Sequence, residues 1–254
     1  MKRKKPFGPR GFDFLARWSQ GAWAESKVIE TINASGFLAV HYGPSRGDPM
    51  SYGDFSAWKK FFEEFQQKLE TCGKRPDLLV FRRESLEREE DRDLVFQLQE
   101  LDDERSSRFV HASSIALEVE TSLWKAKKAL ALGIELSFTV KEEDMDRLTQ
   151  WQRAYDKQIV ITQVFYDSAY AISYDKVKQL VAEGRVKKTK DRKTGKLTYN
   201  VPLSFGEEFA SSVQMPSVEP RVLENERGLV MAFAVFKGGR FELTERGLRL
   251  LRST

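Results

Sequence analysis

The sequence predicts an α/β protein in which helices flank a central mixed β-sheet. Stretches with helical apolar spacing alternate with short apolar runs rich in β-branched residues, a pattern typical of a sheet covered by helices. With 254 residues, 41% of them hydrophobic, the chain can bury a sizeable core. We expect a single domain over 1–254, with a core at about 14–183 and a basic hairpin and β-rich C-terminal extension at about 184–254.

The first part of the chain predicts a helix, a strand, a loop and a second helix. Residues 14–35 have helical apolar spacing, and Gly36 suits the end of a helix because glycine adopts a left-handed backbone readily. Residues 37–41 form a short apolar run, whereas 42–53 are rich in Gly, Pro and Ser, which favours a loop. Aromatic residues repeat every three or four positions in 55–71, so we expect an amphipathic helix whose aromatic side packs in the core.

Two strands enclose a charged segment in the next part of the chain. Residues 75–81 are an apolar run opened by a Pro-Asp pair, and 113–121 have the length and β-branched content of a strand. The many charges of 83–108 predict a surface excursion between these strands, partly helical or mobile, with no chemistry of its own. Residues 124–132, rich in Ala, Leu and Lys, predict a helix.

The same alternation continues through the second half of the chain. Further strands are expected at 134–140, 157–166, 169–173 and 197–201, and further helices at 142–155 and 175–183. A strand pair near 230–243 and a short last helix complete the pattern.

Composition excludes several classes of function. The single cysteine, Cys72, cannot form an internal disulfide, and 229–236 is the longest apolar run, too short for a membrane helix, so we expect a cytoplasmic protein without an export signal. The two histidines, His41 and His111, leave little material for a histidine metal cluster or a nucleophile-histidine-acid triad. Neither a Walker A sequence nor a GxGxxG after a strand is present.

Two glutamates stand two residues apart in the predicted strand 113–121. Alternate side chains of a strand share a face, so Glu118 and Glu120 lie on one face while Leu117 and Val119 lie on the other. Two carboxylates this close raise each other's pKa unless a cation lies between them, which indicates a metal. The alternative is an exposed strand whose outer face is acidic, which is the favoured explanation for an isolated Glu-x-Glu pair.

A third glutamate interrupts the apolar stripe of the first helix. Glu25 follows Trp18 and Ala22 and precedes Ile29 and Ile32 at helical spacing. Burying an unpaired carboxylate is strongly unfavourable, so we expect a positive partner at this position. An ordinary Arg or Lys would serve as that partner.

Glu25, Asp77 and the glutamate pair together resemble the PD-(D/E)XK nuclease superfamily. The shared pattern is a helix that carries a Glu, a strand opened by Pro-Asp, and a strand that ends in an acid, any residue and usually lysine. Residues 134–144 and 163–173 resemble type II restriction endonucleases in particular. The resemblance spans roughly 21–173 and implies a restriction-endonuclease-like core that hydrolyses phosphodiester bonds of double-stranded DNA at a short specific sequence.

The resemblance also implies the roles of individual residues. Asp77 and Glu118 would bind Mg²⁺ with the backbone carbonyl of Val119, and Glu25 would orient a metal-bound water or support a second metal. Glu120 occupies the usual lysine position, where an acid serves as base or metal ligand. Lys125 or Lys127 on the next helix would then supply the missing cation.

Basic residues supply the expected DNA contacts, because lysine and arginine contribute affinity through phosphates. Basic clusters lie at 2–10 and 185–196, and Arg46 lies in the Gly/Pro-rich loop. The candidate DNA-binding residues are Arg46, Arg185, Lys187, Lys188, Lys190, Arg192, Lys193 and Lys196. The alternative for the second cluster is a mobile surface hairpin.

Cutting both strands with one site per chain implies a symmetric homodimer. The resemblance also admits a cognate DNA methyltransferase, acting on the same site, as a separate partner. Two other functions stay open: a repair or recombination nuclease that reads DNA structure, and a non-catalytic nucleic-acid-binding module in which the four acids pair with Arg and Lys.

Overall fold

A seven-stranded mixed sheet forms the centre of the computed structural model, which describes residues 9–44, 55–86, 88–190, 195–224, 228 and 230–252. Its strands, in spatial order, are β1 (Phe37–His41), β2 (Leu78–Arg82), β3 (Ile115–Thr121), β5 (Ile159–Val164), β6 (Ser168–Ser173), β9 (Glu207–Gln214) and β12 (Arg240–Leu243). Among these described strands, only the β3–β5 pairing is parallel. The predicted fold class is confirmed, and β9 and β12 extend the sheet beyond residue 184.

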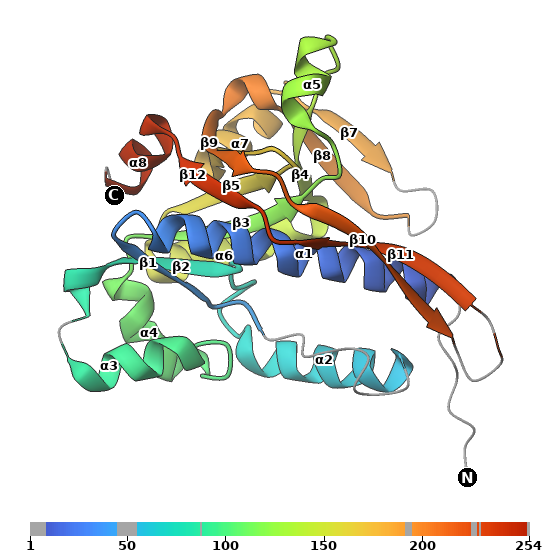
Figure 1. Cartoon of the computed structure of the whole chain (residues 1–254). Helices are drawn as coiled ribbons and strands as arrows, with labels where there is room; N and C mark the ends of the chain where they lie inside the picture. The colour runs from blue at the N-terminus through green and yellow to red at the C-terminus, as the bar shows by residue number, and fades with distance from the viewer. Residues whose placement is uncertain are drawn as a thin grey trace.

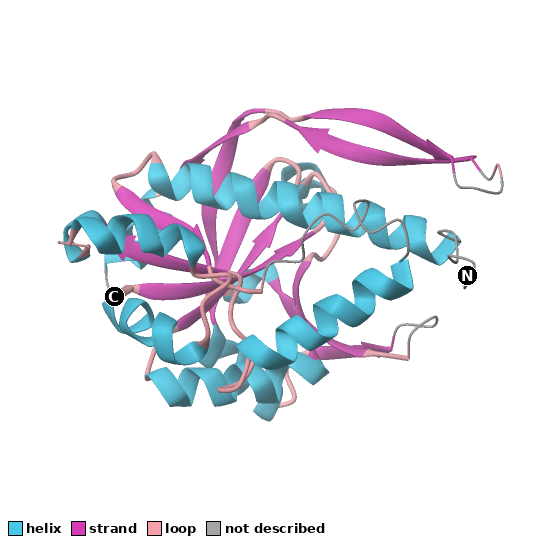
Figure 2. Ribbon diagram, turned by 90° about the horizontal axis from the view of Figure 1, so that it is seen from below, coloured by secondary structure: helices cyan, strands magenta, loops and turns pink. Residues whose placement is uncertain are grey.

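Helices cover both faces of this sheet (Figure 1, Figure 2). They are α1 (Pro9–Asn33), α2 (Phe55–Leu69), α3 (Glu89–Leu94), α4 (Asp103–Ala112), α5 (Ala126–Ala131), α6 (Glu142–Tyr155), α7 (Tyr174–Ala182) and α8 (Glu245–Arg252). Short 3₁₀ turns lie at η2 (Arg83–Ser85), η3 (Val95–Gln97) and η4 (Leu203–Phe205). One core lies between the sheet and α1, and the other between the sheet and α4, α6 and α7. In the part of the chain that the structure describes, no helix has the length and apolar character to cross a bilayer.

Two smaller sheets complete the structure. The strands β4 (Ser137–Lys141), β8 (Leu197–Pro202) and β7 (Lys187–Lys190) form one of them, which includes the predicted basic hairpin. The strands β10 (Ser217–Glu224) and β11 (Val230–Lys237) form a ribbon that runs alongside α1 (Figure 1). The expected strand pair near 230–243 is therefore wrong in its pairing, because β11 pairs with β10 and β12 pairs with β9.

The buried side of α1 differs from the predicted stripe. Ala24, Val28 and Ile32 lie in the core, whereas Ala22 is exposed. Thr31 and Lys27 share the buried side because β12 and its preceding turn accept their hydrogen bonds: Thr31 Oγ1 donates to Phe241 O at 3.5 Å and Lys27 Nζ to Gly239 O at 3.3 Å. Because these two polar residues are hydrogen-bonded on the buried side of α1, apolar spacing alone did not predict which side of the helix is buried.

The segment 83–108 was expected to be a surface excursion, partly helical or mobile, and its helical content is confirmed. Most of its side chains are exposed or half-buried, but Leu86, Val95 and Leu98 are buried in the core on the α6 side of the sheet, so the expectation is wrong for these residues. The strands on either side still pair, since β2 lies antiparallel to β3.

Both faces of β3 are covered, which excludes an exposed acidic face. Ala116 and Leu117 on opposite faces are fully buried, and Glu118 is only 5% exposed. Because α6 lies on the acidic side of the sheet, Glu118 needs internal partners or a bound cation.

We predict that Gly73→Ala destabilises the protein strongly. Gly73 has φ +114°, and a Cβ there would lie 2.3 Å from the carbonyl oxygen of Arg147 on α6. Gly36→Ala is the matched control, because Gly36 has φ +90° and open space where a Cβ would lie. This variant should lower the free energy of unfolding only by the cost of a left-handed backbone, about 1–2 kcal/mol. Urea unfolding should show at least twice that loss for Gly73→Ala; equal losses would contradict the steric argument.

Candidate active site

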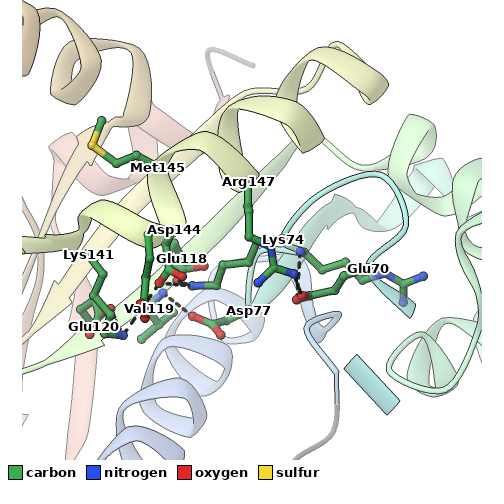
Figure 3. A network of polar contacts seen from close by, with 12 residues as sticks. Glu70, Lys74, Asp77, Glu118, Val119, Glu120, Lys141, Asp144, Met145 and Arg147 are labelled. Atoms are coloured by element: carbon green, nitrogen blue, oxygen red, sulfur yellow. Dashed lines mark hydrogen bonds and ion pairs between the residues drawn. The ribbon is translucent and has the colours of Figure 1, made fainter. Parts of the chain in front are cut away.

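Strand register brings Asp77 and Glu118 together. Leu78 on β2 is opposite Leu117 on β3, so the residue before β2 lies beside the residue after Leu117. The backbone amide of Val119 donates a hydrogen bond of 2.7 Å to Asp77 Oδ2 (Figure 3). These two predicted acids therefore meet at the same edge of the sheet.

The buried residue Arg75 fixes the position of the loop that precedes Asp77. Arg75 is 1% exposed, and its Nε and Nη2 atoms donate to Asp103 Oδ1 at 3.0 and 2.7 Å. Its Nη1 donates to the carbonyl of Leu101 at 2.8 Å. Burial alone would raise the pKa of Asp103, but hydrogen bonds from Thr71 and Arg75 lower it. The segment 83–108 thus holds the loop that carries Asp77.

Glu118 has one bonded and one free carboxylate oxygen. Oε1 accepts a hydrogen bond from Lys74, whereas the buried Oε2 has no partner among the described residues. Burial and the charge of Asp77 raise the pKa of Glu118 to about 8. A buried acceptor without a donor is costly, so this atom suits a cation as its partner.

Lys74 and Asp144 are site residues that the sequence did not indicate. Lys74 Nζ contacts Glu118 Oε1 and lies 3.0 Å from Asp144 Oδ2 in the first turn of α6 (Figure 3). Burial works against the charge of Lys74, but the carboxylates of Glu118 and Asp144 outweigh it and raise the pKa of this lysine. The one available signal was the position of Lys74 three residues before Asp77.

A second lysine accompanies Glu120. Lys141, the last residue of β4, places Nζ 3.3 Å from Glu120 Oε1, and this charge contributes most to raising the pKa of Lys141. Lys125 and Lys127, the helix lysines expected to supply a cation, lie elsewhere. Lys125 stacks over the Tyr166 ring at 5.4 Å, and Lys127 donates to Ser211 Oγ.

Glu25 lies on the α1 side of the sheet, at the rim of a pocket. Its Oε2 is 3.2 Å from His41 Nδ1, a histidine partner in place of the expected Arg or Lys. The pocket is lined by Trp18, Glu25, Lys74 and Asp77, among others. Glu25 therefore shares a pocket with Asp77, whereas Glu118 does not line it.

The donors at the site fit a hard divalent cation. Mg²⁺ prefers carboxylate and carbonyl oxygens, and Glu118, next to Asp77 in the strand register, offers the buried oxygen Oε2 without a donor among the described residues. Within the described ranges, no three Asp, Glu, His or Cys side chains converge as a preformed metal cluster, and the ammonium groups of Lys74 and Lys141 lie among the acids.

In the basic hairpin, β7 is exposed whereas β8 is half-buried, and several of its lysines form ion pairs. Lys187 and Lys196 lie 2.5 Å from Glu135 and Glu143, and Lys188 pairs with Glu142. All four residues of β7, Lys190 included, are exposed. Arg185 stacks over Phe205 at 4.9 Å and pairs with Glu183 at 3.2 Å. Arg46, Arg192 and Lys193 lie outside the described residues.

The model of the AccI restriction endonuclease family matches residues 8–133 and 121–251, nearly the whole chain. The protein belongs to the AccI restriction endonuclease family. Membership confirms the resemblance to restriction endonucleases and makes the protein a DNA nuclease. No curated relative matches this AccI-family nuclease.

Two solved structures are distantly similar to this AccI-family nuclease. The Holliday junction resolvase Hjc of Archaeoglobus fulgidus is 10% identical with a TM-score of 0.35, and the match covers 74% of this chain and 90% of the resolvase. The nuclease D212 from a fusselovirus is 12% identical with a TM-score of 0.31, covering 78% of this chain and 84% of D212.

We predict that Arg75→Met lowers the free energy of unfolding by about 3–5 kcal/mol, because it leaves the buried Asp103 carboxylate without its partner. Lys60→Gln is the control, since Lys60 forms an exposed pair with Glu64 at 3.7 Å and should cost less than about 0.5 kcal/mol. Urea unfolding followed by circular dichroism measures both. Similar small losses would show that Arg75 does not anchor the loop.

Proposed function

We propose that this protein is a Mg²⁺-dependent type II restriction endonuclease, which hydrolyses phosphodiester bonds in double-stranded DNA at a short specific sequence. The observation that carries the proposal is the pairing of Asp77 with Glu118, whose free buried oxygen points to a cation, in a chain of the AccI family. Within the described ranges, neither Asp77 nor Glu118 forms an ion pair with an arginine.

Asp77 and Glu118 would hold Mg²⁺, with the carbonyl oxygen of Val119 as a further ligand. Bound there, Mg²⁺ lowers the pKa of an attacking water and neutralises charge that develops on the scissile phosphate. The amide of Val119 orients Asp77 through its 2.7 Å hydrogen bond. Glu25, in the adjoining pocket, would orient water from the α1 side.

Glu120 and Lys141 would act together at the open side of the site. Glu120 stands where the superfamily usually has lysine, and Lys141 places an ammonium 3.3 Å from it. The Lys141 side chain is 44% exposed, so it can reach a phosphate while Glu120 accepts a proton. The pair thus supplies both a base and a positive charge.

The exposed lysines of β7, together with Lys196 before β8, would contact DNA phosphates. Their ion pairs with Glu135, Glu142 and Glu143 are exposed and weak, so phosphates can replace them. A symmetric homodimer would cut both strands. A cognate methyltransferase acting on the same site would protect host DNA.

Digestion of a sequenced plasmid with Mg²⁺, followed by sequencing of the ends, tests the function. Discrete fragments with one common end sequence are the expected result. Cleavage confined to branched DNA would favour a repair nuclease, and tight binding without cleavage would favour a non-catalytic module.

We predict that Asp77→Ala and Glu118→Ala each slow this cleavage by at least about 10³-fold, because charge stabilisation by the metal is worth several kcal/mol. DNA binding, measured by gel shift in Ca²⁺, should persist. Asp175→Ala on α7 is the control and should cut normally. Full activity of either Asp77→Ala or Glu118→Ala would contradict the proposed metal site.

We predict that Glu120→Gln lowers the cleavage rate by about 10–100-fold, in the range of outer-shell partners of a metal site. Glu120→Lys should lower it further, because a second ammonium would lie beside Lys141. Rates are compared over a Mg²⁺ titration. Unchanged rate and metal dependence in both variants would show that Glu120 is a bystander.

A further inference from the structure

The charged groups around Glu118 form a connected set, and the adjoining Arg147–Glu70 ion pair adds no net charge to it. Hydrogen bonds and ion pairs join four carboxylates and two ammonium groups within the described residues: Asp77, Glu118, Glu120 and Asp144, with Lys74 and Lys141. Asp77 joins the set through the Val119 amide and its proximity to Glu118. With every carboxylate ionised, as ligation of a cation requires, four negative and two positive charges leave a net charge of −2. One divalent cation neutralises it.

The backbone holds Lys74 in place. Its amide donates to the carbonyl of Arg147 on α6 at 3.1 Å, and Gly73 before it leaves no room for a Cβ against the same carbonyl. The side chain, 13% exposed, then reaches Glu118 Oε1 and Asp144 Oδ2 (Figure 3). Backbone and side-chain contacts therefore hold the Lys74 ammonium group at the site.

Lys74 binds only one of the two carboxylate oxygens of Glu118. One oxygen is bound by the ammonium, and the other is buried with no donor from the described part of the chain, on a residue that the strand register places next to Asp77. Lys141 has a different position, since it is more exposed and contacts Glu120 and Asp144. Of the two lysines, Lys74 is thus the one that competes directly with a metal ion for Glu118.

We propose that Lys74 is a permanent counter-ion and positioning residue of Glu118, which restricts the site to a single divalent cation on Glu118 Oε2 and Asp77. The inference rests on the proposed metal-dependent function of the same site. It gives Lys74 two tasks: to fix the orientation of the Glu118 carboxylate, and to take the place that a second cation would otherwise occupy. Asp144 holds the ammonium from the other side.

Removing the ammonium should change the number of ions that bind. In Lys74→Gln the net charge becomes −3 and both oxygens of Glu118 are free, so a second divalent cation can enter. Lys74→Arg keeps the charge and should keep one ion. Lys178→Gln, which removes a lysine paired with Asp175 at 2.7 Å on α7, is the matched control.

The experiment counts Mn²⁺ bound to the full chain without DNA, by calorimetry and by electron paramagnetic resonance, with Asp77→Ala marking the site. The wild type, Lys74→Arg and Lys178→Gln should each bind one ion at the marked site. Lys74→Gln should bind two, the first at least about tenfold more tightly than in the wild type. Circular dichroism checks the fold of each variant.

Two outcomes overturn the inference. Two ions in the wild type would show that Lys74 does not restrict the site, and this count does not depend on whether Lys74→Gln folds. A folded Lys74→Gln that binds Mn²⁺ with the wild-type number and affinity would assign Lys74 a purely structural role.

Failure of the proposed function gives a different result. A wild type that binds one ion, with two in Lys74→Gln, but cuts no DNA would leave the inference standing and remove the nuclease proposal. A wild type that cuts DNA, with unchanged Mn²⁺ binding in Lys74→Gln, would remove the inference alone.

Discussion

The buried ion pair between Arg75 and Asp103 is the interaction on which the site depends. It joins the loop before β2 to the segment between β2 and β3, two parts of the chain that share no regular pairing at this point within the described residues. The guanidinium also satisfies backbone carbonyls of Leu98 and Leu101, so its desolvation is offset by several hydrogen bonds. Lys74 and Asp77 flank this residue, and their positions follow from it.

Like charges gather at the site because each is compensated locally. Glu118 and Glu120 would repel each other on an ordinary strand, but each has an ammonium group from a different element, Lys74 from the loop before β2 and Lys141 from the end of β4. Compensation is incomplete at Glu118, whose second oxygen lacks a donor in the described part of the chain. Under the proposed function, the negative charge that the two lysines leave uncompensated is what a divalent cation would neutralise.

The two faces of the sheet contribute differently. The face packed against α6 presents Glu118 and Glu120, whereas the α1 side contributes Glu25 and its His41 partner at the rim of a pocket. Asp77, at the mouth of β2, contacts β3 and also lines that pocket. It therefore connects the two halves of the site.

Local patterns in the sequence predicted many of the helices and strands and two of the candidate site residues. The predicted helix 142–155 and strand 37–41 match α6 and β1, because apolar periodicity and turn residues act over a few positions. Alternation in β3 and the Pro-Asp pair indicated Glu118 and Asp77. Only the tertiary structure decided which faces meet: Lys74 reaches Glu118 across 44 positions and Asp144 across 70, and polar Lys27 and Thr31 lie on the buried side of α1. Periodicity specifies which residues share a face, but the partner across that face depends on long-range packing.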